Sequence, residues 1–138
     1  MSGLLFVDRV AGFDLSAFND FAPARLPVSL NGVPHHAMSA DTEFARFDFR
    51  QRQFAMGDVP AGVEATLSGP SAGVLQWMRL ELDGETRYEN RPTLEMEFCG
   101  HWTHMLHRFP RMMAVKAGEF VPVMFHHDRS QVSLTLIE

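Results

Sequence analysis

Cysteine and lysine are almost missing from this 138-residue chain, which has one of each, Cys99 and Lys116. A lone cysteine cannot form an internal disulfide bond, so a secreted, disulfide-stabilised domain is excluded and a reducing, cytoplasmic location is expected. No basic segment precedes an apolar one at the N-terminus, and no apolar run is long enough to span a bilayer. We therefore expect neither a signal peptide nor a membrane partner.

Positive charge is also scarce. Twelve Lys and Arg residues against seventeen Asp and Glu residues give a formal net charge of -5. Nonspecific nucleic-acid binding requires a broad basic face, so no nucleic-acid partner is expected. No glycine-rich phosphate loop of standard spacing occurs either. The length suits one domain and leaves no room for an additional cofactor-binding domain.

Alternation of apolar and polar residues is the main structural signal, because it gives a strand one buried and one solvated face. Five stretches show it: residues 45–49, 63–67, 78–82, 94–98 and 132–136. Asp83-Gly84 predicts a tight hairpin, and residues 127–130 predict a terminal turn. We predict a single all-β domain over residues 1–138, an antiparallel barrel or sandwich of roughly seven to nine short strands.

Residues 15–36 interrupt this strand-like character. A short helix can begin near residues 14–21, capped by Asp14 or Ser16, and a proline-rich apolar stretch follows it. Such a segment either projects as an arm that finds a partner surface or folds back as a surface loop. Both interpretations stay open, and the first includes a self-association module without enzymatic activity.

The seven histidines raise the possibility of a metal or small-ligand site in a β-barrel. His101, His104 and His107 are spaced by three residues, so a strand or a helix cannot direct all three at one ion. A metal site would need histidines from separate strands. The alternative is that they are ordinary surface or half-buried side chains.

Gly100-His101-Trp102 is the most distinctive motif. A glycine followed by a titratable ring and a large aromatic ring can present both rings at the start of a strand. An aromatic face can hold a cation such as guanidinium. The alternative is that Trp102 packs in the core and His101 is its exposed neighbour.

The order of several short motifs resembles the C-terminal β-barrel domain of protein arginine methyltransferases. These motifs are Gly12-Phe13-Asp14-Leu15-Ser16, the apolar segment after it, Phe47-Asp48-Phe49, Gly100-His101-Trp102 and Val115-Lys116-Ala117-Gly118-Glu119. The resemblance extends from about residue 10 to residue 138.

The resemblance implies specific roles. His101 would pair with an acidic group of a cofactor-binding domain, and Trp102 would form a wall of the substrate arginine pocket. Gly100 stands where the family usually has threonine. Residues 15–36 would be a homodimerisation arm. The family's glycine-rich S-adenosylmethionine turn and its glutamate hairpin are missing from the sequence. We therefore expect no cofactor on this chain, and no methylation of a protein or peptide arginine unless a cofactor domain is joined to it. The chain is then either a fragment of a larger enzyme or a stand-alone domain.

Overall fold

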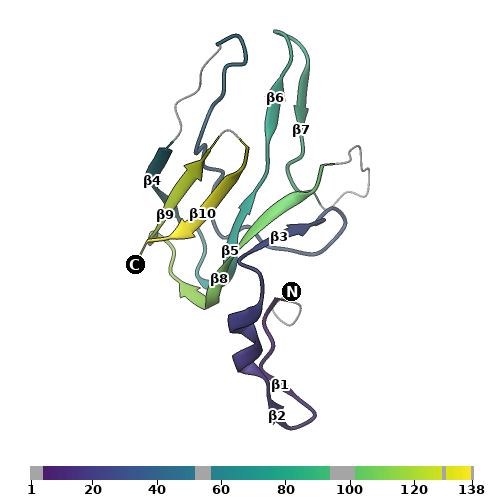
Figure 1. Ribbon diagram of the computed structural model, residues 1–138, viewed down its shortest axis with the longest axis vertical. Helices are drawn as coiled ribbons and strands as arrows, with labels where there is room; N and C mark the ends of the chain where they lie inside the picture. Colours follow the sequence, from purple (N-terminus) through teal and green to yellow (C-terminus); the bar gives the residue numbers. More distant parts are fainter. Residues whose placement is uncertain (1–4, 52–56, 94–101, 129, 138) are drawn as a thin grey trace. The chain divides into compact units, whose positions relative to one another are not determined.

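The computed structural model describes residues 5–51, 57–93, 102–128 and 130–137 (Figure 1). Its elements are one short 3-10 helix and ten strands in this described part of the chain. They are β1 (Arg9–Val10), β2 (Phe13–Asp14), η1 (Ser16–Phe21), β3 (Arg25–Val28), β4 (Gly57–Glu64), β5 (Gly69–Gln76), β6 (Arg79–Glu81), β7 (Arg87–Glu89), β8 (His104–Val115), β9 (Phe120–His127) and β10 (Val132–Leu136).

The prediction of an antiparallel all-β chain is confirmed. The pairs β1–β2, β3–β8, β4–β9, β6–β7 and β9–β10 are all antiparallel. The strands form two sheets of three and two sheets of two, and no closed barrel is found within the described ranges. None of the helical residues described forms a helix long and apolar enough to cross a membrane.

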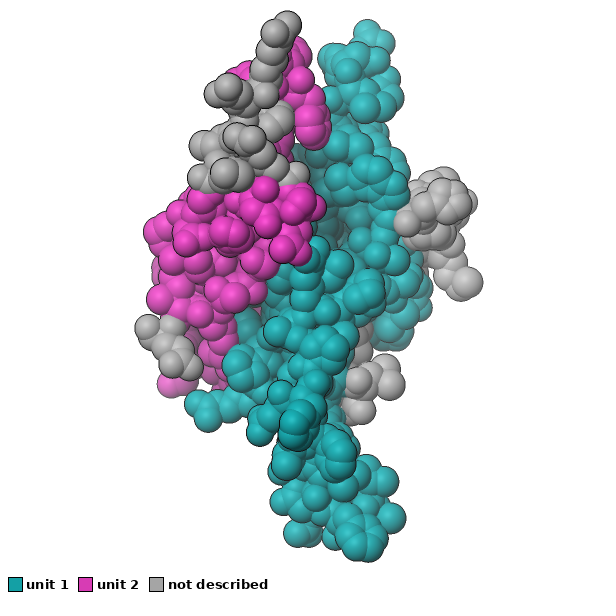
Figure 2. Space-filling model, in the orientation of Figure 1, with its two compact units in different colours: residues 1–36, 72–112 teal, residues 37–71, 113–138 magenta. Residues whose placement is uncertain are grey.

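The chain divides into two compact units, coloured separately in Figure 2. Unit 1 consists of residues 1–36 and 72–112, and unit 2 of residues 37–71 and 113–138. Strands β5 and β8 each pass from one unit into the other along the chain. Each unit is described separately below.

Unit 2 is built on the sheet β10-β9-β4. Strand β9 pairs with β4 along its whole length, from Gly57 opposite His127 to Glu64 opposite Phe120. Alternate residues of β9 are buried, and they join other apolar side chains in a core that excludes water. This core consists of Ala65, Val115, Val121, Val123, Phe125 and Leu134.

Unit 1 contains the sheet β3-β8-β5 together with the β1–β2 and β6–β7 hairpins. Among its described residues, two apolar side chains are buried, Leu106 and Phe109, beside three polar ones, His104, His107 and Arg108. All five lie in the first part of β8. Burying a polar group without a hydrogen bond costs free energy. The stability of this unit therefore depends on the hydrogen-bond partners of these three side chains.

Both predicted hairpins form. The Asp83 carboxylate accepts hydrogen bonds from the backbone N–H of Glu85 and Thr86 and joins β6 to β7. Asp128 accepts in the same way from Ser130 and Gln131 between β9 and β10. The residue range 132–136 predicted for the last strand is confirmed.

The strand predicted at residues 45–49 is wrong. This stretch contains no strand, and its charged residues pair locally: Arg46 with Glu43, and Arg50 with Asp48. Phe49 is exposed, so the alternation here does not mark a buried face. The strand predicted at residues 94–98 lies outside the described residues.

The segment 15–36 begins with η1 and continues into β3. The Asp14 carboxylate accepts from the Ser16 N–H just before the helix, which lowers the pKa of Asp14. Strand β3 then pairs with the start of β8, with Arg25 opposite His107 and Val28 opposite His104. Residues 25–28 are therefore hydrogen-bonded into the sheet of unit 1.

Candidate functional site

Trp102 lies just before β8, and 46% of its surface is exposed. Its indole ring meets the ring of Tyr88 from β7, with centroids 5.8 Å apart and planes at 67°. This edge-to-face arrangement is favourable for aromatic pairs. The structure thus presents Trp102 as a half-exposed side chain against a second aromatic ring. His101 and Gly100, predicted as its neighbours in the site, lie outside the described residues.

Asn90 fastens the chain on which Trp102 sits. Its side-chain Oδ1 accepts from the Met78 N–H at 2.6 Å, and its backbone N–H donates to the Met78 carbonyl at 3.1 Å. Its Nδ2 donates to the Trp102 carbonyl at 3.5 Å. One asparagine therefore joins the start of the β6–β7 hairpin to the segment entering β8.

His104 adds a second anchor two residues after Trp102. Its ring is 1% exposed, and its Nε2 donates to the Asn90 carbonyl at 2.7 Å. Its Nδ1 lies 3.4 Å from the Leu30 N–H donor and 3.3 Å from the Val28 carbonyl. His104 thereby connects the backbone at the end of β3 with the backbone of Asn90. A buried histidine satisfied on both nitrogens is a structural group, unavailable as a metal ligand.

His107 faces a different set of neighbours. Its Nε2 donates to Gln76 Oε1 of β5 at 2.8 Å. Burial, assisted by the positive charge of Arg25, lowers its pKa to about 4. The close approach of β5 requires Gly73, because a Cβ there would lie 2.2 Å from the His107 carbonyl oxygen.

Arg108 anchors η1. Its Nη2 donates to the carbonyls of Asn19 at 2.7 Å and Ala22 at 3.2 Å, at the end of that helix. Phe6 covers the guanidinium at 4.9 Å from its ring centroid, a cation–π contact. The Nε and Nη1 atoms of Arg108 are buried and have no hydrogen-bond partner among the described residues. The side chain therefore holds the helix end through one of its three nitrogens.

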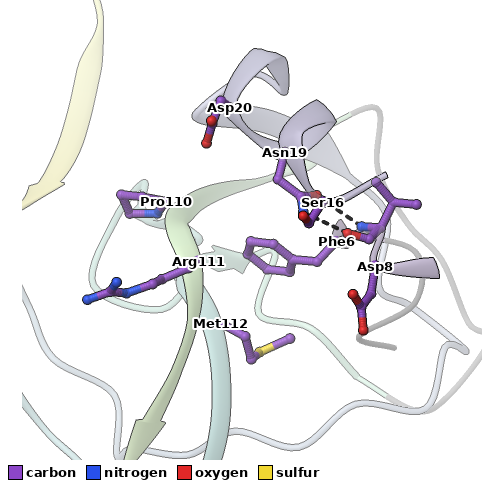
Figure 3. Close-up of a pocket in the computed structure, with 9 residues that line it drawn as sticks. Phe6, Asp8, Ser16, Asn19, Asp20, Pro110, Arg111 and Met112 are labelled. Carbon is purple, nitrogen blue, oxygen red and sulfur yellow. Dashed lines mark hydrogen bonds between the residues drawn. The ribbon is translucent and has the colours of Figure 1, made fainter. Parts of the chain in front are cut away.

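An open hollow of about 390 Å³ lies between η1 and residues 110–112 of β8 (Figure 3). Asn19 and Val7 exchange two hydrogen bonds at its edge. It is lined by apolar groups and by charges of both signs: Phe6, Val7, Asp8, Ser16, Asn19, Asp20, Pro110, Arg111 and Met112. Trp102, which is the one predicted site residue within the described ranges, is not among these lining residues.

The histidines do not gather at a metal centre in the part of the chain that the structure describes. No three His, Cys, Asp or Glu side chains there are placed to share an ion. His104 and His107 have separate partners, as their opposite orientation on a strand predicts. In unit 2, the His126 ring pairs with Asp58 on the surface.

Sequence reasoning singled out Trp102 but missed the residues that hold it. Tyr88 and Asn90 belong to no motif in the sequence, and His104 stands out only as one of three histidines spaced by three residues. Their role arises from hydrogen bonds across more than ten positions of sequence, which alternation and spacing do not encode. The hairpin signal at Asp83-Gly84 was the available clue, since it places β7 and Asn90 opposite β6.

Comparison with known proteins gives a distant relationship and no family. No model of a known protein family matches the chain. It is 27% identical over 114 residues to an arginine N(omega)-methyltransferase of Streptomyces achromogenes subsp. streptozoticus. The chain is a distant, partial relative of that methyltransferase. The match covers 82% of this chain and 31% of the relative, so this chain spans about a third of the relative's length.

Proposed function

We propose that the chain is the substrate-binding and dimerisation domain of an arginine N-methyltransferase-like enzyme, and that it transfers no methyl group without a cofactor-binding domain. The observation that carries the proposal is the relationship to an arginine N(omega)-methyltransferase across 82% of the chain. Two local features support it: the Gly100-His101-Trp102 motif and the half-exposed position of Trp102.

Each motif residue has a role in this proposal. Trp102 forms one wall of the pocket for the substrate guanidinium, because an aromatic face attracts a delocalised cation. His101 pairs with an acidic group of the cofactor-binding domain, and Gly100 gives the loop room beside the substrate. S-adenosylmethionine supplies the methyl group and is held by that other domain. The residues of this chain orient the guanidinium, which is the positional part of catalysis.

The dimerisation role falls on the segment 15–36. Large apolar side chains are exposed there: Phe18 is 63% and Phe21 85% accessible. Exposed apolar groups in one patch mark interaction surfaces. Arg108 holds the end of the same helix, so the patch is presented on an anchored element.

A domain exchange tests the catalytic part of the proposal. The matching segment of the Streptomyces enzyme is replaced by this chain, and methyl transfer from S-adenosylmethionine to arginine is measured. We expect the hybrid to be active, the hybrid with Trp102→Ala to lose at least ten-fold in kcat/KM, and this chain alone to be inactive. A folded hybrid without activity, or one indifferent to Trp102→Ala, contradicts the proposal.

Self-association is tested separately by light scattering on the chain itself. Phe18→Ser combined with Phe21→Ser removes apolar surface without touching the hydrogen bonds of β3. We expect this variant to be monomeric at concentrations where the unchanged chain forms dimers. Leu82→Ser is the matched control, because Leu82 is 68% exposed in the β6–β7 hairpin. Equal masses for the unchanged chain and the double variant would count against the dimerisation role.

A further inference from the structure

The Tyr88–Trp102 pair is an aromatic corner. The two ring planes stand at 67° with centroids 5.8 Å apart, so two aromatic rings meet at an angle at one place. Trp102 is about half exposed and Tyr88 is partly exposed. A planar cation that lies on one ring is then close enough to the other ring to be attracted by both.

Hydrogen bonds of Asn90 and His104 join the chain segments that carry the two rings. Asn90 follows Tyr88 by two residues and reaches the backbone of both Met78 and Trp102. The buried His104 ring closes the arrangement through the Asn90 carbonyl. These bonds connect the residues that follow β7, the strand that carries Tyr88, with the segment that carries Trp102.

The charged residues beside Tyr88 on β7 pair with other described residues. The Glu89 carboxylate, adjacent to Tyr88, is paired with Arg79 at 3.0 Å and Arg87 at 3.5 Å. Tyr88 alternates with these residues along β7, so its ring lies on the other face of the strand. Among the described residues, the groups at the corner that attract a cation are therefore the two aromatic rings.

We propose that Tyr88 is a second wall of a guanidinium-binding corner with Trp102, and that Asn90 is the positioning residue that sets the corner's geometry. The choice of guanidinium as the cation rests on the proposed function. The corner itself rests on the ring geometry and on the hydrogen bonds of Asn90.

The test titrates the isolated chain with Nα-acetylarginine amide and follows the indole N–H signals by NMR. Trp77→Phe identifies which signal belongs to Trp102. We expect a saturable shift of the Trp102 signal with the arginine compound and none with Nα-acetylcitrulline amide, which has the same shape and no charge. No saturable shift, or an equal response to the neutral compound, overturns the proposal.

Two variants separate the roles. Tyr88→Leu should weaken binding about two- to five-fold, as expected for one exposed cation–π contact, while Tyr88→Phe should keep it. Asn90→Ala should shift the Trp102 indole signal before any ligand is added. It should also weaken binding of the arginine compound relative to Tyr88→Phe, which we expect to bind with unchanged affinity. Binding that is insensitive to Tyr88→Leu refutes the second wall.

The outcome is distinguishable from that of the domain exchange. Guanidinium binding at the corner together with an inactive hybrid would refute the enzymatic proposal and leave the corner standing. An active, Trp102-dependent hybrid whose KM for arginine is unchanged by Tyr88→Leu would support the enzymatic proposal and refute the second wall.

Discussion

Acidification is expected to destabilise this protein through His107. The ring is buried, hydrogen-bonded to Gln76, and close to the positive charge of Arg25, and its pKa is lowered to about 4 from the ordinary 6.5. The folded state therefore disfavours the proton that the unfolded state binds readily. Stability from this source is complete above pH 6.5 and is lost as the pH falls toward 4.

The magnitude follows from the two pKa values. Between pH 7.5 and pH 4.5 the unfolded chain takes up nearly a full proton at this position, and the folded chain takes up about a quarter of one. The resulting loss in the free energy of unfolding is about 2–3 kcal/mol as an upper limit. That is a large share of the total stability of a small domain.

Urea denaturation followed by circular dichroism at a series of pH values measures this loss. His107→Gln is the matched control, because glutamine does not titrate and can still donate to Gln76. The unchanged chain should lose up to about 2–3 kcal/mol more than the variant between pH 7.5 and pH 4.5. Parallel pH profiles for the two proteins would refute the reasoning, as would an NMR titration of the His107 ring with an ordinary pKa.

Three further expectations concern single positions. Gly73→Ala should lower the free energy of unfolding by about 1–3 kcal/mol or more, since its Cβ would lie 2.2 Å from the His107 carbonyl oxygen. Gly84→Ala is the control: Gly84 has open space around it, so the substitution should change the free energy of unfolding by under about 0.5 kcal/mol. Leu134→Ala in the core of unit 2 should cost about 2–5 kcal/mol in thermal or urea unfolding, and a smaller loss would mean that the site collapses around the cavity. Asp128→Ala should lower the melting temperature by removing three hydrogen bonds of the β9–β10 turn, and an unchanged melting temperature would show that the turn forms without them.

Local chemistry explains which parts of the fold could be predicted. Asp83 and Asp128 form their turns through side-chain oxygens that bond to N–H groups two or three residues away, so the signal and the structure are both local. The last strand alternates correctly because one face of it packs on the core of unit 2. At residues 45–49 the same alternation does not mark a strand: the charged residues form exposed local ion pairs, and Phe49 is exposed instead of packing on a core.

The amino-acid sequence by itself determined the all-β class, the two hairpin turns and the prominence of Trp102, because each depends on residue types within a few positions. Only the tertiary structure decided that the Tyr88 ring contacts Trp102 and that Asn90 and His104 hydrogen-bond the neighbouring backbone. It also decided that β5 approaches the backbone of β8 closely at Gly73. These contacts join residues far apart in sequence. They arise because buried N–H, C=O and ring nitrogen groups must each find a partner, and the available partner is known only once the strands have come together.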